Sequence, residues 1–175
     1  MEDLTRLIIS HERIEKINKN NIELTYEETH YINKVMRIKN GKEIFIANGK
    51  GSLWKAIKVK NDCLEIIQLK KPYLFQEPEI YLLGIAVVIP KRGFEDILKM
   101  CTEIGIDFIQ PLFSDRQVNK NLNFSRKLLR WNLIIKEAVE QSERLWKPSI
   151  LNGVDIIEWL KSRNCLLYTS DAADE

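Results

Sequence analysis

Three basic side chains follow the ends of two predicted strands, where they could bind an anion. Lys91 and Arg92 come after an apolar run and before a helix start, and Arg116 comes after a second apolar run. Phosphates and cofactors bind at such strand ends and helix N-termini in α/β proteins. A guanidinium also forms paired hydrogen bonds to a phosphate or a base edge. The pattern predicts an anion site, with an exposed basic turn at 91–92 and a pair of Arg116 with Asp115 as the simpler alternatives.

The elements that would position these side chains form a strand–helix–strand unit. The run from Ile80 to Ile89 predicts a strand buried on both faces, as in a parallel sheet, and residues 108–113 predict the next strand. Between them, a stripe of apolar residues at helical spacing predicts a helix that stops at Gly105. The stripe consists of Phe94, Ile97, Leu98, Cys101 and Ile104.

The residues after this unit predict two more helices and the beginning of a third strand. Helical patterns cover 125–146 and 155–162, and the run from Cys165 to Tyr168 then has the composition of a strand. Three strands are too few to complete a parallel sheet covered on both faces. We therefore expect the chain to carry only the first part of an α/β domain, with residues 166–175 either non-native or an acidic tail.

Residues 1–71 predict a smaller, β-rich domain. A short strand is expected at 7–10, and Thr25 to Glu28 has the capping-box pattern of a helix that runs to Met36. Further strands, separated by turn-forming residues, are expected over 43–47, 53–59 and 64–69. This spacing favours a small barrel or a curled sheet. Residues 72–78 contain two prolines and predict a linker to the second domain, 79–165.

The composition excludes several classes of protein. Among 175 residues, 45% are hydrophobic and 30% charged, which is typical of a globular protein, and the net charge is only +2. Any affinity for nucleic acid must therefore come from a local patch. The three cysteines are far apart and His11 and His30 have no metal-like spacing, so neither a disulfide framework nor a metal site is predicted. We expect a cytoplasmic protein without a secretory signal or a membrane span.

Four short motifs occur in an order that resembles one family. They are Lys91-Arg92-Gly93, Thr102-Glu103-Ile104-Gly105, the run from Pro111 to Arg116, and the run from Glu140 to Arg144. With these motifs the chain resembles the RsmE family, bacterial enzymes that use S-adenosylmethionine to methylate N3 of a uridine in 16S ribosomal RNA. The N-terminal domain is similar as well, at Val35-Met36-Arg37 and at Gly41-Lys42-Glu43.

The resemblance implies a fold and a set of partners. It implies a PUA-like RNA-binding β-barrel, then the first part of a SPOUT methyltransferase domain, an α/β fold with a trefoil knot that is usually dimeric. The implied partners are 16S ribosomal RNA or the small ribosomal subunit. The family's Gly-Pro-Glu-Gly-Gly and Leu-Arg-x-Glu-Thr segments, which form the knot and hold the cofactor, do not occur in this sequence. We therefore expect no cofactor-binding residues here and no activity of this chain alone.

Two cations are the catalytic candidates. Loss of the N3 proton leaves a uridine anion, which a positive charge stabilises. Lys99 matches the basic residue of the first SPOUT motif, so the resemblance implies a catalytic role for it, and Arg116 is the second candidate. Glu95 and Glu103 lie four residues on either side of Lys99, so an ordinary ion-paired helix face is the alternative.

The remaining candidates are predicted to contact RNA. They are Lys91, Arg92, Arg37, Gln141 and Arg144. The amide of Gln141 could read a base edge or brace a loop, whereas Arg144 could simply pair with Glu140 one helical turn earlier. Arg37 could contact phosphates or belong to the solvated surface. The family usually has a small residue at the position of Glu143.

Two other functions remain open on the sequence alone. One is an RNA-binding module without catalysis, in which the barrel and the basic edge grip structured RNA. The other is a knotted RNA methyltransferase with a different target base. A glycine-rich knot segment in the full reading frame would distinguish a methyltransferase from the RNA-binding module. The identity of the modified base would distinguish the uridine-N3 methyltransferase from one with another target.

Overall fold

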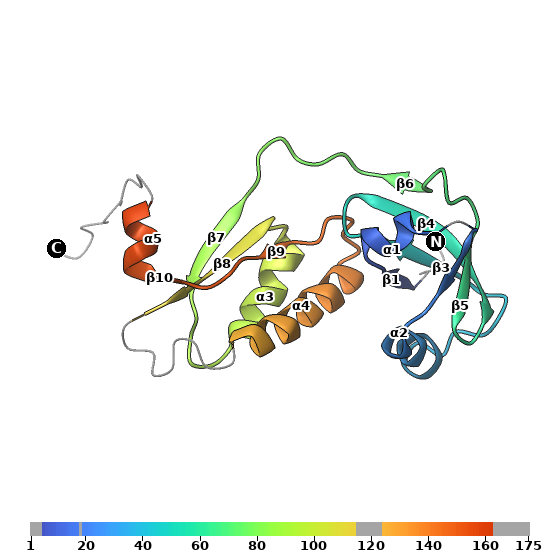
Figure 1. Cartoon of the computed structure of the whole chain (residues 1–175), viewed down its shortest axis with the longest axis horizontal. Helices are drawn as coiled ribbons and strands as arrows, with labels where there is room; N and C mark the ends of the chain where they lie inside the picture. The colour runs from blue at the N-terminus through green and yellow to red at the C-terminus, as the bar shows by residue number, and fades with distance from the viewer. Residues whose placement is uncertain (1–4, 18, 115–123, 163–175) are drawn as a thin grey trace, which may run out of the picture.

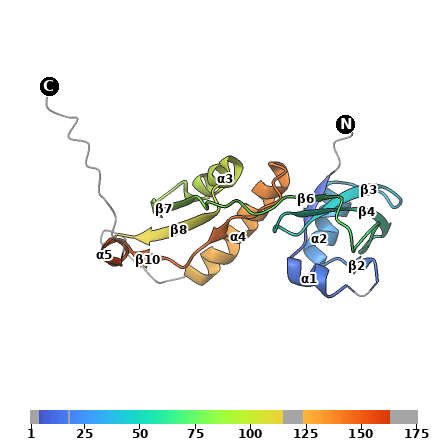
Figure 2. The same ribbon diagram turned by 90° about the horizontal axis from the view of Figure 1, so that it is seen from above.

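Alternating polarity in the first half of the chain and unbroken apolar runs in the second half produce two different sheets. A computed structural model describes residues 5–17, 19–114 and 124–162. Figure 1 shows an elongated molecule with one sheet at each end, and the long helix α4 (Phe124–Gln141) reaches from the second sheet towards the first. The view from above in Figure 2 shows the same separation of the two sheets.

The first sheet consists of short, mostly antiparallel strands. They are β1 (Arg6–Ile8), β2 (Asn21–Glu23), β3 (Glu43–Ala47), β4 (Ser52–Lys60), β5 (Cys63–Ile66) and β6 (Leu74–Phe75). Their order is β1-β3-β4-β5-β2, and β6 pairs with β4. The strand expected at 43–47 is confirmed at both ends, and its neighbours differ by one to three residues. Among the described residues, the edge strands β1 and β2 do not pair with each other. The structure therefore shows a curled sheet and does not show a closed barrel.

Short helices cover this sheet: α1 (His11–Glu15), α2 (Tyr26–His30) and the π-helical turn η1 (Tyr31–Val35). The predicted capping box at the start of α2 is confirmed. The N–H of Glu28 donates to Thr25 Oγ1 at 3.2 Å, and the N–H of Thr25 donates to Glu28 Oε2 at 2.9 Å. Together the two segments cover most of the expected helix and end at Val35, with Met36 as the C-cap.

The second sheet is parallel throughout. Its strands are β7 (Gly84–Val88), β8 (Phe108–Phe113), β9 (Ser149–Ile150) and β10 (Val154–Asp155). Both β9 and β10 pair with the same edge of β8, so they are two pieces of one interrupted strand. The sequence did not predict this strand, because each piece is only two residues long. The strand expected at 165–168 lies outside the described residues.

The helices α3 (Phe94–Ile104) and α4 pack together beside this sheet, and α5 (Ile156–Ser162) follows β10. The predicted helix over 94–104 and its stop at Gly105 are confirmed, and Gly105 has the left-handed φ of 97°. One member of the predicted stripe is wrong: Ile104 is 74% exposed, and Thr102 is buried instead. Helix α4 ends at Gln141, five residues before its expected end, because the chain turns at Glu143, whose φ is 58°.

The prediction that residues 80–89 form a strand buried on both faces is wrong. The strand β7 begins only at Gly84, where pairing with Phe108 starts, and Ile80 and Tyr81 are 90% and 88% exposed. Residues 79–83 belong to the crossing between the two sheets (Figure 1). Within the described sheet β7 is an edge strand, so it has a neighbour on one side only. An apolar run alone does not distinguish a buried strand from an edge strand with an exposed approach.

The two sheets are joined by an interdomain seam, defined here as residues 49–51 against residues 145–147. The N–H of Gly51 donates to the carbonyl of Leu145, and the N–H of Lys147 donates to that of Gly49, both at 3.0 Å. Lys50 and Trp146 form a β-bridge between these hydrogen bonds. Apolar residues of the first sheet also join the core of the second: Ile8, Ala47 and Leu53. The domains therefore pack through both backbone pairing and a shared core.

Candidate functional site

The predicted basic site lies in the loop between β7 and α3. Gly93 has a left-handed φ of 82° and caps α3, which places Lys91 and Arg92 on the exposed loop before the helix. A hollow of about 330 Å³ lies there, and helix α4 contributes Lys127 and Arg130 to its wall. We call these four basic residues and the hollow the edge loop. The structure thus adds two cations to the two that the sequence identified.

Most of this positive charge is not neutralised. Arg130 forms a bidentate pair with Glu95, with distances of 2.6 Å from Nε to Oε1 and 2.9 Å from Nη2 to Oε2. Within the described part of the chain, Lys91, Arg92 and Lys127 form no ion pair. Three solvated cations at the start of a helix can bind phosphates, because the positive end of the helix dipole favours an anion there as well.

Of the two catalytic candidates, the structure places only Lys99. Lys99 lies on the exposed face of α3, and the ion pair with Glu95 that was the alternative to a catalytic role is absent, because Glu95 pairs with Arg130 of α4. Arg116 lies outside the described residues. Its catalytic role stays a prediction, as does that of Lys99.

Gln141 and Arg144 lie at the other end of α4, away from the edge loop. Arg130 and Gln141 are separated by about 16 Å of helix, at 1.5 Å per residue. Gln141 is exposed. Arg144 is half-buried and lies over the end of α3, where a Cβ on Gly105 would stand 2.3 Å from its Nη1. This cation therefore lies beside the carbonyl end of a helix, a position that stabilises positive charge without a ligand.

The ion pair considered as an alternative for Arg144 is absent, because Glu140 turns towards the first domain. Its Oε1 accepts the N–H of Ile8 at 2.7 Å, and burial raises the pKa of this carboxyl. Nearby, Glu143 has a left-handed φ of 58°, a conformation that glycine adopts more readily than glutamate. Arg6 compensates by donating to the carbonyl of Glu143 and, at 2.8 Å, to its carboxylate.

Arg37 lies far along the chain from the other candidates, directly after η1. It is exposed and has a left-handed φ of 53°. Arg37 lines neither the hollow of the edge loop nor the larger cavities between and beside the described domains. Of the six candidates in the described residues, Lys91 and Arg92 therefore share the edge loop, whereas Lys99, Arg37, Gln141 and Arg144 lie elsewhere.

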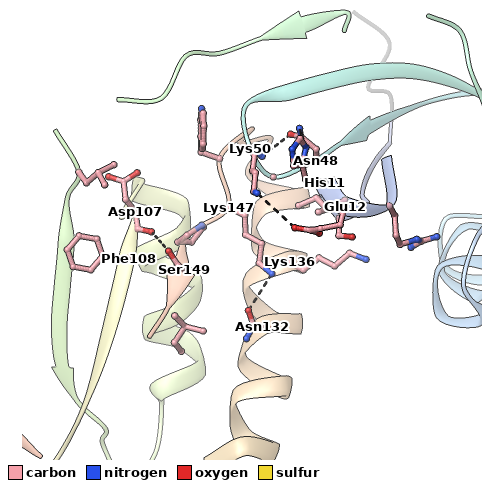
Figure 3. Close-up of a pocket in the computed structure, with 18 of the residues that line it drawn as sticks. His11, Glu12, Asn48, Lys50, Asp107, Phe108, Asn132, Lys136, Lys147 and Ser149 are labelled. Carbon is pink, nitrogen blue, oxygen red and sulfur yellow. Dashed lines mark hydrogen bonds and ion pairs between the residues drawn. The ribbon is translucent and has the colours of Figure 1, made fainter. Parts of the chain in front are cut away.

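A second cavity, of about 720 Å³, lies between the two domains (Figure 3). We call it the interdomain cleft. Its wall includes Lys136 of α4 and Lys147 of the seam, neither of which the sequence identified. The sequence offered a signal for Lys127 and Arg130, which are three residues apart on a polar helix face. The sequence offered no signal for Lys147, because the residue that it packs against, Gly49, lies nearly 100 positions earlier.

The structure bears on two expected absences. In the described ranges, histidine, cysteine and acidic side chains form no group of three or more that could hold a metal ion. Among the helices described, none is both long and apolar enough to cross a membrane.

Family models match both domains. Residues 77–174 match a model described as RNA methyltransferase domain, and residues 24–57 match one described as RNA methyltransferase PUA domain. A solved RsmE enzyme from Neisseria gonorrhoeae, bound to S-adenosyl methionine, superposes with a TM-score of 0.73 at 21% identity. That superposition covers 91% of this chain and 65% of the other. The class is therefore a PUA domain followed by a SPOUT-type methyltransferase domain.

Curated relatives carry the name ribosomal RNA small subunit methyltransferase E. The protein from a Synechocystis species is 33% identical over 147 residues, which are 83% of this chain and 46% of the relative. The protein from Buchnera aphidicola of Schizaphis graminum is 32% identical over 80% of this chain and 58% of its own length. The chain belongs to the RsmE family of RNA methyltransferases. It spans about half the length of these relatives.

Proposed function

We propose that this chain forms the RNA-binding part of an S-adenosylmethionine-dependent methyltransferase that modifies N3 of a uridine in 16S ribosomal RNA. The observation that carries the proposal is the edge loop, because it presents unpaired cations at the carboxyl end of a parallel strand in a chain that also has a PUA domain. The names of the relatives support small-subunit ribosomal RNA as the substrate. We further propose that the full-length protein acts as a homodimer on the small ribosomal subunit.

The roles proposed for individual residues follow from their charge. Lys91 and Arg92 bind RNA phosphates at the edge loop, with Lys127 and Arg130 beside them. Arg37, Gln141 and Arg144 would extend the RNA contact surface. Lys99 and Arg116 are the candidates for stabilising the uridine anion once its N3 proton has left.

The residues at the edge loop do not fit the cofactor. S-adenosylmethionine supplies the methyl group, and its sulfonium centre is a cation, which ammonium and guanidinium groups repel. The sequence also contains neither the Gly-Pro-Glu-Gly-Gly nor the Leu-Arg-x-Glu-Thr segment that the resemblance assigns to cofactor binding. We therefore assign no step of the reaction to a cofactor held by these residues, and we expect this chain to bind RNA without S-adenosylmethionine.

The test is a methyl-transfer assay on small ribosomal subunits that lack the modification. It compares this chain with a longer protein that contains it and has the length of the relatives, and mass spectrometry identifies the modified base. We expect the longer protein to produce N3-methyluridine. We expect the chain alone to bind the RNA and to transfer no methyl group, and calorimetry to detect no binding of S-adenosylmethionine to it.

Two other results would contradict parts of the proposal. A methyl group on another base would replace the uridine assignment with a knotted methyltransferase of different specificity. RNA binding by the longer protein without any methyl transfer would favour the second candidate, an RNA-binding module without catalysis. The edge loop favours that candidate to the same extent, because its cations explain RNA binding and do not require catalysis.

A further inference from the structure

The interdomain cleft has the size and composition of a binding site for a nucleotide unit. Its volume of about 720 Å³ is in the range of ligand pockets, which is about 300–1,000 Å³. Figure 3 shows side chains from both domains around it: Asn48 and Lys50 from one side, and Asn132, Lys136 and Lys147 from the other. Phe108 and Trp146 add apolar ring surface to the same wall. Amides, cations and rings are the groups that recognise a phosphate and its base.

The seam holds Lys147 in place. Its N–H donates to the carbonyl of Gly49 in the first domain at 3.0 Å. The packing is close, since a Cβ on Gly49 would lie 3.1 Å from the Cβ of Lys147. This cation is therefore positioned only when the two domains are docked.

The other charged groups of the cleft already have partners. Glu28 accepts from Arg13 at 2.6 Å and lies 4.0 Å from Lys136, and Lys50 lies 4.0 Å from Glu12. Asp107 accepts the N–H of Leu83 at 2.7 Å. These acids are engaged with other groups.

Lys147 differs from them. Its Nζ lies 3.4 Å from Asn132 Oδ1, a neutral amide, and no acid of the described chain pairs with it. Burial lowers the pKa of Lys147, and the nearby charge of Lys136 lowers it further. A desolvated cation without an anionic partner destabilises the fold, and an anion from outside the chain would relieve that cost.

We propose that the interdomain cleft binds a phosphate of the RNA together with its nucleoside, with Lys147 as the principal cation and Lys136 and Asn132 beside it. This inference rests on the proposed function and adds a second RNA contact at a site distinct from the edge loop. RNA is the source that we favour, because Lys50 is exposed at the same cleft and would continue the contact to a neighbouring phosphate.

The test measures the affinity of the full chain for a labelled single-stranded RNA oligonucleotide of mixed sequence by fluorescence anisotropy. Lys147→Met removes the charge and keeps the length of the side chain. We expect its affinity to fall about tenfold or more, as for a lost hydrogen bond to a charged group. The slope of log K against log salt should also decrease by about 0.7, the value for one phosphate on a single strand. The matched control is Lys161→Met on α5, an exposed lysine outside the cleft, which should bind within about twofold of the original chain.

The melting temperature separates a binding role from a structural one. Because Lys147→Met removes an unpaired, half-buried charge, its melting temperature should equal or exceed that of the unchanged chain. Affinity within twofold of the unchanged chain would overturn the proposal, and so would weaker binding with an unchanged salt slope and a lower melting temperature.

Two further arms separate the alternatives. If RNA binding is lost only in a Lys91→Ala, Arg92→Ala double variant, the cleft proposal fails while the proposed function stands. If the unchanged chain binds no RNA, the proposed function fails and the cleft proposal with it. Uridine monophosphate and inorganic phosphate serve as competitors. Uridine monophosphate could displace the labelled RNA from the unchanged chain and not from Lys147→Met, while the RNA affinity of the variant stays unchanged. That result would assign the cleft to a free nucleotide instead of RNA and overturn the proposal.

Discussion

The edge loop and the interdomain cleft both present positive charge, but they hold it in different surroundings. At the edge loop Lys91, Arg92 and Lys127 are exposed and belong to one domain. In the cleft Lys147 is half-buried and is positioned by a hydrogen bond to the other domain. Water stabilises the first group of charges, whereas nothing in the described chain neutralises the second.

The two regions should therefore respond differently to substitution. Exposed charges contribute little to stability, so the edge loop can be altered with little effect on folding. The cleft is assembled by tertiary contacts, so damage to the seam affects stability and binding together. Three substitutions of decreasing effect, each compared with a second substitution, test this distinction.

The largest effect is expected at Gly51 of the seam. Its φ is +88°, and a Cβ there would lie 2.3 Å from the carbonyl oxygen of Gln76 and 2.9 Å from the ring of Trp146. Gly51→Ala should lower the free energy of unfolding by about 2–5 kcal/mol, from left-handed strain and overpacking combined. Urea denaturation followed by tryptophan fluorescence measures this change.

Gly93 of the edge loop is the matched control for Gly51. Its φ of +82° is similar, but the nearest atom to a new Cβ is Asp96 Oδ2 at 4.0 Å. Gly93→Ala should therefore cost only the conformational strain, about 1–2 kcal/mol. Equal losses at the two glycines would show that the seam is no more tightly packed than the edge loop.

A smaller, pH-dependent effect is expected at Glu140, where burial rather than exposure again decides the outcome. Burial raises the pKa of this carboxyl above its ordinary value of 4.5, so its contribution to stability is present below that pH and is lost as the pH rises through the folded-state pKa. Glu140→Gln keeps an acceptor for the N–H of Ile8 and removes the charge. We expect it to stabilise the protein at pH 7 by up to about 1 kcal/mol and to have little effect at pH 4.

Glu28 provides the opposite case for the same measurement. Burial would raise its pKa, but the hydrogen bonds from Arg13 and from the N–H of Thr25 outweigh burial, so the pKa is lowered. Its contribution is therefore present above pH 4.5 and is lost as the pH falls through the folded-state pKa. Urea midpoints at several pH values should show Glu28→Gln destabilising at neutral pH. A Glu140→Gln profile parallel to that of the unchanged chain would rule out the burial effect.

The smallest effect on stability is expected at Glu95 of the edge loop. Its pair with Arg130 is exposed, so Glu95→Ala should change the free energy of unfolding by less than about 1 kcal/mol. Because Arg130 then becomes available to phosphates, RNA affinity should rise and depend more steeply on salt. Anisotropy titrations at several salt concentrations measure this. Glu103→Ala on the same helix is the control, and an equal rise in both variants would indicate a general charge effect.

The sequence predicted those elements whose signals are local. The capping box at Thr25, the strand at 43–47 and the helix that stops at Gly105 depend on residues a few positions apart, and all three are confirmed. The burial of Ile80 was predicted wrongly, and the ion pair of Glu95 with Lys99, which was the alternative to a catalytic Lys99, does not form. Both depend on which segment lies alongside, and Glu95 meets Arg130 from 35 residues later instead of Lys99 one turn away.

By itself the sequence determined the two-domain order, the basic loop at Lys91 and Arg92, and the motifs shared with the RsmE family, because periodicity, caps and turn residues act over short distances along the chain. Only the tertiary structure decided that β9 and β10 form one interrupted strand beside β8, and that Lys147 lies half-buried against Gly49 without an ion pair to any acid of the described residues. Desolvation and pairing are properties of the folded surroundings, which residues distant in the chain create together.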